Sequence, residues 1–89
     1  MPVLLVTYDL KKPGQAYSDL LAKLKSQAWA RLSESSYAVS TALTPRQLYD
    51  QLRPSMDAND NLYIINLTRP YYGYGPGDVN AWLESNLPY

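Results

Sequence analysis

The chain has 89 residues, of which 8 are basic and 8 acidic, and it contains neither cysteine nor histidine. This length suits a single domain, residues 1–89, with one modest core. The missing residue types exclude disulfides, cysteine or histidine zinc sites and every catalytic triad that depends on histidine. Any metal held by side chains would be an oxygen-seeking ion such as Mg²⁺. The zero formal charge weakens the case for non-specific binding to nucleic acid.

The first predicted element is a strand in the middle of a sheet. Four consecutive aliphatic residues begin at Val3, a pattern typical of a strand that is buried on both faces. Asp9 follows at the exit of this strand, where a fixed backbone presents a polar side chain to solvent or to a partner. The apolar run is too short for a signal peptide or a membrane span, so we expect a soluble, cytoplasmic protein with no membrane partner.

A turn at residues 11–14 and a helix over residues 15–27 should come next. The helix is predicted because apolar residues recur with helical spacing. These residues are Tyr17, Leu20, Leu21, Leu24 and Ala28. Apolar and polar residues then alternate over residues 29–33 and 37–41, which predicts a hairpin of two strands.

The second predicted helix begins after Thr44. Thr44 is a good cap, Pro45 suits the first helical position, and Gln47 lies where its side chain can reach back to the cap. Leu48, Tyr49 and Leu52 are expected to form its buried stripe, and Pro54 to mark its end.

The last part of the chain predicts one more strand and one short helix. A polar turn over residues 57–61 leads to an apolar strand at 62–67, and an aromatic loop rich in glycine and proline follows. Asp78 is expected to cap the final helix. Its inward residues should be Val79, Trp82, Leu83 and Leu87.

This order of elements predicts an α+β protein with a ferredoxin-like βαββαβ sandwich. Four strands form an antiparallel sheet, two helices cover one face, and a short C-terminal helix is added. In this fold the first strand lies inside the sheet beside the fourth, which is an edge. Within that edge strand Asn66 is the one interior polar residue, so we expect it to pair with another copy in a homodimer.

Several segments resemble the SinR-like hypothetical proteins, relatives of the small dimeric CRISPR-associated adaptation subunit and of virulence-associated protein D. They are Tyr8-Asp9-Leu10, the Lys-Lys-Pro-Gly-Gln turn, the Ala-Trp…Leu-Ser-Glu-Ser hairpin and the Asp-Ala-Asn-Asp-Asn-Leu segment before the fourth strand. The similarity to the SinR-like group covers most of residues 3–87; to the adaptation subunit it is limited to the fold order and the Tyr-Asp pair.

The resemblance implies a ferredoxin-like homodimer and, in some relatives, a Mg²⁺-dependent nuclease in which this Asp of each protomer meets its mate near the two-fold axis. Only Asp9 corresponds to that residue. The arginines that often follow it in the adaptation subunit are replaced here by Lys11, Lys12 and Pro13. Many relatives with this fold act as structural or DNA-bridging subunits.

Asp9 therefore has two interpretations. Two Asp9 carboxylates brought together across a dimer axis repel each other and draw in a divalent cation, which makes Asp9 a candidate metal ligand and catalytic residue. Alternatively, Asp9 caps the turn by accepting backbone N–H groups near Lys12 or Gly14.

The aromatic loop also has two interpretations. Tyr71, Tyr72 and Tyr74 beside Arg69 are candidates for stacking on bases or on a nucleotide, and Lys11 and Lys12 are candidate nucleic-acid contacts near Asp9. Alternatively, the tyrosines pack on Trp82 to hold the terminal helix, or cover the edge strand at a dimer contact.

Two functions follow. The first is a homodimeric nucleic-acid-associated protein similar to the adaptation subunit, with weak Mg²⁺-dependent nuclease activity through Asp9. The second is a non-catalytic interaction protein, for example a defence or counter-defence factor, that binds a partner protein or a small nucleotide at the aromatic loop. The Lys11-Lys12 pair favours the first and the neutral charge the second, so the sequence leaves catalysis undecided.

Overall fold

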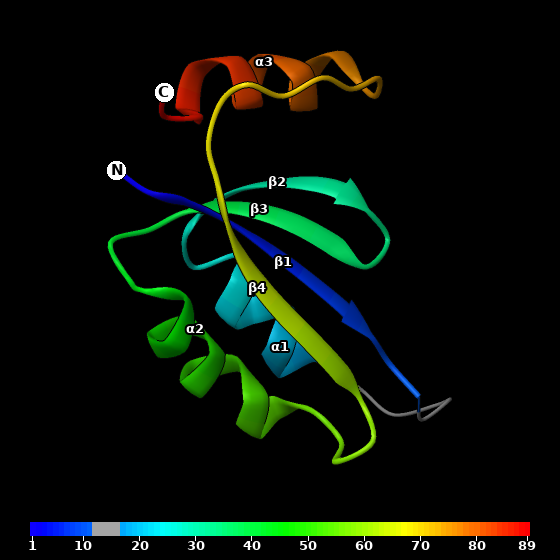
Figure 1. Cartoon of the computed structure of the whole chain (residues 1–89). Helices are drawn as coiled ribbons and strands as arrows, with labels where there is room; N and C mark the ends of the chain where they lie inside the picture. Colours follow the sequence, from blue (N-terminus) through cyan, green and yellow to red (C-terminus); the bar gives the residue numbers. More distant parts are fainter. Residues whose placement is uncertain (12–16) are drawn as a thin grey trace.

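The structure is a computed structural model that describes residues 1–11 and 17–89 (Figure 1). The predicted turn residues Lys12, Pro13 and Gly14 lie outside the described part. The elements are β1 (Val3–Asp9), α1 (Ser18–Leu24), β2 (Ala28–Ser33), β3 (Ser36–Ser40), α2 (Pro45–Leu52), the 3₁₀ helix η1 (Arg53–Ser55), β4 (Asn61–Leu67) and α3 (Gly77–Asn86).

The four strands form one antiparallel sheet in the order β2-β3-β1-β4. This arrangement confirms the predicted ferredoxin-like α+β fold. β1 lies inside the sheet, with Leu5 opposite Ala38 of β3 on one side and Ile65 of β4 on the other. β4 is an edge strand, as expected from the order of elements.

The main core lies between α1, α2 and one face of the sheet. Alternate residues of a strand point to the same face, so Leu4, Val6 and Tyr8 of β1 all join this core. Its other buried members are Leu20, Leu24, Tyr37, Val39, Leu48 and Leu52. Burying each leucine stabilises the fold by about 1.5–3 kcal/mol, which is how the two helices are held against the sheet.

The start of α2 has the capping box that the sequence predicts. Thr44 Oγ1 accepts a hydrogen bond from the Gln47 N–H at 3.1 Å, and the Thr44 N–H donates to Gln47 Oε1 at 3.0 Å. Pro45 occupies the first turn, where a missing N–H costs nothing. Leu48 and Leu52 are buried as predicted, whereas Tyr49 is 37% exposed, so its expected place in the buried stripe is wrong.

Two predicted helix boundaries are wrong. The first helix was expected over residues 15–27, but α1 ends at Leu24, and residues 15 and 16 lie outside the described part. Ala28 instead begins β2 opposite Ser40, because pairing within the sheet outweighs the local helical spacing. The last helix begins at Gly77 after Pro76, so Asp78 lies in the first turn and is not the cap.

The second face of the sheet is covered at one end by α3 (Figure 1). Leu87, at the end of this helix, is buried against Val3 and Ala38, and Trp82 packs against the same cluster. Farther along this face, Tyr63 and Ile65 of β4 are 66% and 52% exposed. No described helix combines the length and the apolar composition that crossing a membrane requires.

Candidate functional site

The candidate site is a pocket of about 720 Å³ between the aromatic loop and α3. We call it the aromatic-loop pocket. The loop, residues 68–76, leaves β4 and runs back beside α3 (Figure 1), so that Arg69 and Tyr71 contact residues 13 to 18 positions later in the sequence. Its lining residues are Arg69, Pro70, Tyr71, Tyr72, Gly73, Asn80, Glu84 and Tyr89.

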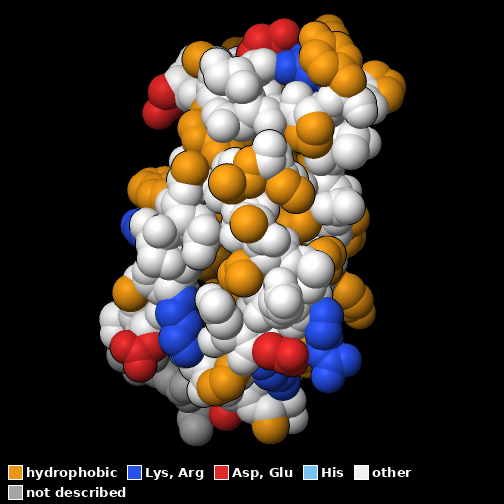
Figure 2. All heavy atoms as spheres, turned by 90° about the vertical axis from the view of Figure 1, so that its left-hand side faces the viewer, with side chains coloured by type: hydrophobic (Ala, Val, Ile, Leu, Met, Phe, Trp, Pro, Cys, Tyr) orange, Lys and Arg blue, Asp and Glu red, His pale blue; other side chains and the backbone are white. Residues whose placement is uncertain are grey.

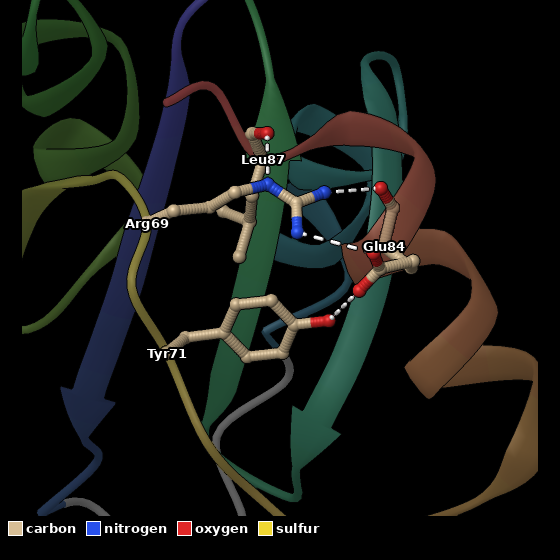
Figure 3. A network of polar contacts seen from close by, with 4 residues as sticks. All are labelled: Arg69, Tyr71, Glu84 and Leu87. Atoms are coloured by element: carbon tan, nitrogen blue, oxygen red, sulfur yellow. Dashed lines mark hydrogen bonds and ion pairs between the residues drawn. The ribbon is translucent and has the colours of Figure 1, made fainter.

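Arg69 ties the loop to the end of α3 (Figure 3). Its Nε donates to the Leu87 carbonyl oxygen at 3.0 Å, Nη1 donates to Glu84 Oε1 at 3.2 Å, and Nη2 donates to the main-chain oxygen of Glu84. The side chain is 16% exposed. A cation at this position also stabilises the carbonyl end of the helix dipole.

Tyr71 completes the same network. Its hydroxyl donates to Glu84 Oε2 at 2.7 Å. The Arg69 guanidinium carbon lies between two rings, 5.7 Å from the Tyr71 ring centroid and 4.7 Å from the Tyr89 ring centroid. The hydrogen bonds from Tyr71 and Arg69 lower the pKa of Glu84, and the bond to Glu84 raises the pKa of the Tyr71 hydroxyl. The polar groups of Arg69 and Tyr71 are therefore used to position the loop.

Tyr72 and Tyr74 differ from Tyr71, because both are fully exposed. Tyr72 lines the aromatic-loop pocket, and both residues line a second cavity of about 280 Å³ between the loop, α3 and the sheet. Trp82, the predicted packing partner of the tyrosines, is packed against the cluster around Leu87 instead. Two apolar rings held in solvent on an anchored loop are typical of a binding surface.

Asp9 and the aromatic loop lie at opposite ends of β1. Asp9 is opposite Asn61 at one end of β4, and Val3 is opposite Leu67 at the other, just before the loop. A rise of about 3.3 Å per residue separates the two ends of the strand by about 20 Å. The predicted contacts Asp9 and Lys11 therefore do not share a site with the tyrosines, and Lys12 lies outside the described residues.

Asp9 lies at the surface and belongs to no cluster of acidic side chains among the described residues. Its side chain is 60% exposed, and one carboxylate oxygen lies 2.5 Å from the Lys11 ammonium group. Among residues 1–11 and 17–89, no three acidic, histidine or cysteine side chains gather closely enough to hold a metal ion. Within the described residues, Asp9 would contribute a single carboxylate to any bound Mg²⁺.

Asp60 is the buried acid of the region around Asp9. It is 5% exposed and accepts hydrogen bonds from the N–H groups of Lys11 and Asp57, at 2.7 and 2.8 Å, and from the Tyr17 hydroxyl at 2.9 Å. Burial by itself raises the pKa of Asp60. The three hydrogen-bond donors and the positive charge of Arg53 together lower the pKa by more than burial raises it, so the net shift is downward. Asp60 thus joins the exit of β1, the start of α1 and the turn before β4.

The structure also brings together the two tryptophans, which sequence reasoning did not connect. Trp29 of β2 and Trp82 of α3 line a groove of about 490 Å³ with Arg31, Pro76 and Val79. The Lys25 ammonium group lies 5.0 Å from the Trp29 ring centroid. No spacing in the sequence predicts this groove, because β2 and α3 meet only in the folded chain.

Comparison with known proteins assigns no role to these residues. Comparisons with protein-family models, with curated proteins and with solved structures find no match for this chain. The resemblance to the SinR-like group stays a hypothesis, and the function has to be argued from the geometry described above.

Proposed function

We propose that this protein is a homodimeric nucleic-acid-associated protein that binds single strands through Tyr72 and Tyr74. The full exposure of these two rings, on a loop fixed to α3, is the observation that carries the proposal. Stacking a base on an aromatic ring is worth about 1–3 kcal/mol, and it tolerates any sequence because every base has a flat face.

The anchoring of the loop supports this function. Arg69 and Tyr71 hold the loop against Glu84 before any ligand arrives, so little conformational freedom is left to lose on binding. Gly73 separates the two tyrosines in the chain, and apart from these two neighbours a Cβ added there would meet no atom within 4 Å. Apart from Tyr72 and Tyr74, the space beside Gly73 is therefore open.

The charge distribution supports a proposal in which stacking, not phosphate neutralisation, supplies most of the affinity. The formal charge is zero, and Arg69, which lines the aromatic-loop pocket together with Tyr72, is paired with Glu84. On the face shown in Figure 2, hydrophobic side chains are spread over the middle, and most charged ones lie toward the two ends. We therefore expect moderate affinity for single strands and little affinity for duplexes, whose bases are already stacked.

The test is fluorescence anisotropy with a labelled oligothymidylate and with a duplex of the same length. The double substitution Tyr72→Ala/Tyr74→Ala should weaken single-strand binding at least about tenfold, the equivalent of about 1.4 kcal/mol. Tyr49→Ala, which removes an exposed tyrosine from α2, serves as the control and should bind like the native protein. Undiminished binding by the double variant would rule out the loop.

A small nucleotide is a narrower ligand for the same site. The aromatic-loop pocket falls within the usual range of small-ligand pockets, about 300–1,000 Å³, and its lining offers the Asn80 amide beside the rings. If the pocket holds one nucleotide, free mononucleotides should displace the oligothymidylate. If they do not, the ligand must be longer than one nucleotide or must lie on the rings alone.

A Mg²⁺-dependent nuclease is the second candidate function. It is favoured by the exposed position of Asp9 at the exit of the central strand, next to Lys11. This function depends on a dimer in which the two Asp9 carboxylates converge. Cleavage of a labelled oligonucleotide in Mg²⁺, abolished by chelation and by Asp9→Asn, would support it; cleavage that persists in Asp9→Asn would remove Asp9 from the reaction.

A further inference from the structure

The two edges of the sheet differ in how well they are protected. β2 carries the exposed Arg31 and a break in its pairing register between Arg31 and Ser33, and both features discourage a further strand. β4 contains no charged residue and no proline, and it pairs with β1 without a break from Asn61 to Leu67. Only β4 therefore offers a regular, uncharged edge.

The hydrogen-bond pattern shows which backbone groups of β4 point outward. The Tyr8 N–H donates to Ser35 on the β3 side, at 3.0 Å. Since backbone groups of successive residues in a strand point to opposite sides, the even-numbered residues of β1 face β3 and the odd-numbered ones face β4. In the matching register of β4, the residues that point away from β1 are Leu62, Ile64 and Asn66.

The side chains on either side of Ile64 complement each other. Tyr63 and Ile65 lie on the second face of the sheet, beyond the part that α3 covers, where they are 66% and 52% exposed. Their β1 partners on that face, Thr7 and Leu5, are also uncharged. When two such strands pair about a two-fold axis at Ile64, Tyr63 of each copy lies opposite Ile65 of the other, and an aromatic ring beside a β-branched side chain is a favourable cross-strand pair.

We propose that β4 pairs with β4 of a second copy, antiparallel and centred on Ile64, so that two sheets become one. This inference rests on the homodimer of the proposed function and specifies its interface. With the axis at Ile64, the outward-pointing backbone N–H and C=O groups of Leu62, Ile64 and Asn66 all have hydrogen-bond partners in the other strand. An axis at Tyr63 or Ile65 leaves one outward residue without a partner in the strand.

This pairing keeps the two Asp9 residues apart. Asp9 is opposite Asn61, three residues from Ile64, and the two copies run in opposite directions from the axis. The Asp9 residues are then separated by about 20 Å along the strands, and both copies of β4 lie between them. Mg²⁺ binds oxygen ligands at about 2.1 Å, so this dimer excludes a metal ion shared by two Asp9 carboxylates.

Cysteine cross-linking tests the register, because the native chain has no cysteine. The single variants Tyr63→Cys and Ile65→Cys, mixed and oxidised, should form a disulfide-linked dimer, since directly opposite Cβ atoms are about 4.5–5.5 Å apart. Each variant alone should cross-link poorly, because its own symmetry mate is a diagonal neighbour about 7–8 Å away. A mixture of Tyr63→Cys and Leu67→Cys tests the alternative register, in which the two-fold axis lies at Ile65 and these two residues are directly opposite. In the proposed register this mixture should also cross-link poorly.

Sedimentation equilibrium on the full chain gives the second measurement. Ile65→Lys should raise the dimer dissociation constant at least about tenfold, because the ammonium group would replace the apolar partner of Tyr63. The control is Leu32→Lys, which puts the same charge on an exposed apolar position of β2 and should leave the dimer intact. Circular dichroism spectra of both variants should match that of the native protein, which checks that both variants fold.

The outcomes separate this inference from the proposed function. A dimer that cross-links in another register, or that Ile65→Lys leaves unchanged, overturns the β4 pairing and retains the homodimer. A monomeric native protein overturns both. Oligothymidylate binding is measured separately on the same variants, and it should survive Ile65→Lys because Tyr72 and Tyr74 lie beyond the end of β4.

Discussion

Arg69 binds both the carboxylate and the main-chain carbonyl of Glu84, so one side chain fixes the aromatic loop to α3 through two different groups of one residue. The same guanidinium also reaches Leu87, whose side chain is buried on the sheet. Loop, helix and sheet thus meet at Arg69. The exposed tyrosines owe their fixed position to this junction and have no comparable polar contacts in the described network.

Arg69→Ala should destabilise the fold and weaken ligand binding together. The substitution removes three donors to Glu84 and Leu87. A hydrogen bond that involves a charged group contributes about 1.5–3 kcal/mol, but the Glu84 side chain is 67% exposed, and solvent reduces the contribution of its pair with Arg69. We expect a loss of about 1–3 kcal/mol in the free energy of unfolding, measured by urea denaturation with tryptophan fluorescence. Arg46→Ala removes an exposed pair with Asp50 and should cost about 0.5 kcal/mol or less. Equal losses in the two variants would contradict the role of Arg69.

Asp60 should make the stability of the fold depend on pH in the acid range. Its folded pKa is lowered, so its carboxylate stabilises the fold fully above the unfolded value, about 3.9, and this contribution is lost as the pH falls through the folded pKa. Melting temperature measured between about pH 2 and pH 5 should therefore rise with pH in the native protein. Asp60→Asn should melt several degrees lower at neutral pH and rise less steeply.

The control for Asp60 is Asp50→Asn, which removes an exposed carboxylate from α2. It should change the melting temperature far less, because Asp50 is bonded only to a side chain of its own helix in the described contacts. If Asp60→Asn melts like the native protein at neutral pH, the contacts with Lys11, Asp57 and Tyr17 do not hold this corner of the fold.

The fold was predictable because its signals are local. The apolar run after Val3 and the capping box at Thr44 depend on residues that are adjacent in the sequence, and they specify the central strand and the start of α2. The end of α1 was not predictable in this way. Ala28 fits the helical spacing, but its pairing with Ser40 is a contact that only the assembled sheet creates.

The candidate site was predictable only as a list of residue types. Arg69 and the tyrosines are recognisable as a loop with binding chemistry, but Glu84 has no signal in the sequence that links it to them. The hydrogen bond to Glu84 distinguishes Tyr71, which positions the loop, from the fully exposed Tyr72 and Tyr74, and only the fold could make that distinction. The groove between Trp29 and Trp82 escaped prediction for the same reason.

Asp9→Asn should leave oligothymidylate binding within about twofold of the native value. Asp9 lies at the end of β1 opposite the aromatic loop, and its ion pair with Lys11 is exposed, where such pairs contribute about 0–1 kcal/mol to stability. Fluorescence anisotropy and a melting curve on the same preparation check both expectations. A large loss of binding would show that nucleic acid contacts the Asp9 end of the sheet.

The salt dependence of binding should be shallow. For single strands the slope of log K against log salt concentration is about −0.7 per phosphate neutralised, and Tyr72 and Tyr74 bring no charge while Arg69 is already paired with Glu84. We therefore expect a slope shallower than about −1 in anisotropy titrations over a series of NaCl concentrations. A steep slope would indicate that cations hold the strand. The groove beside Trp29 would then be the better site, since Lys25 and Arg31 lie there, and Lys25→Ala would weaken binding more than the loss of both loop tyrosines.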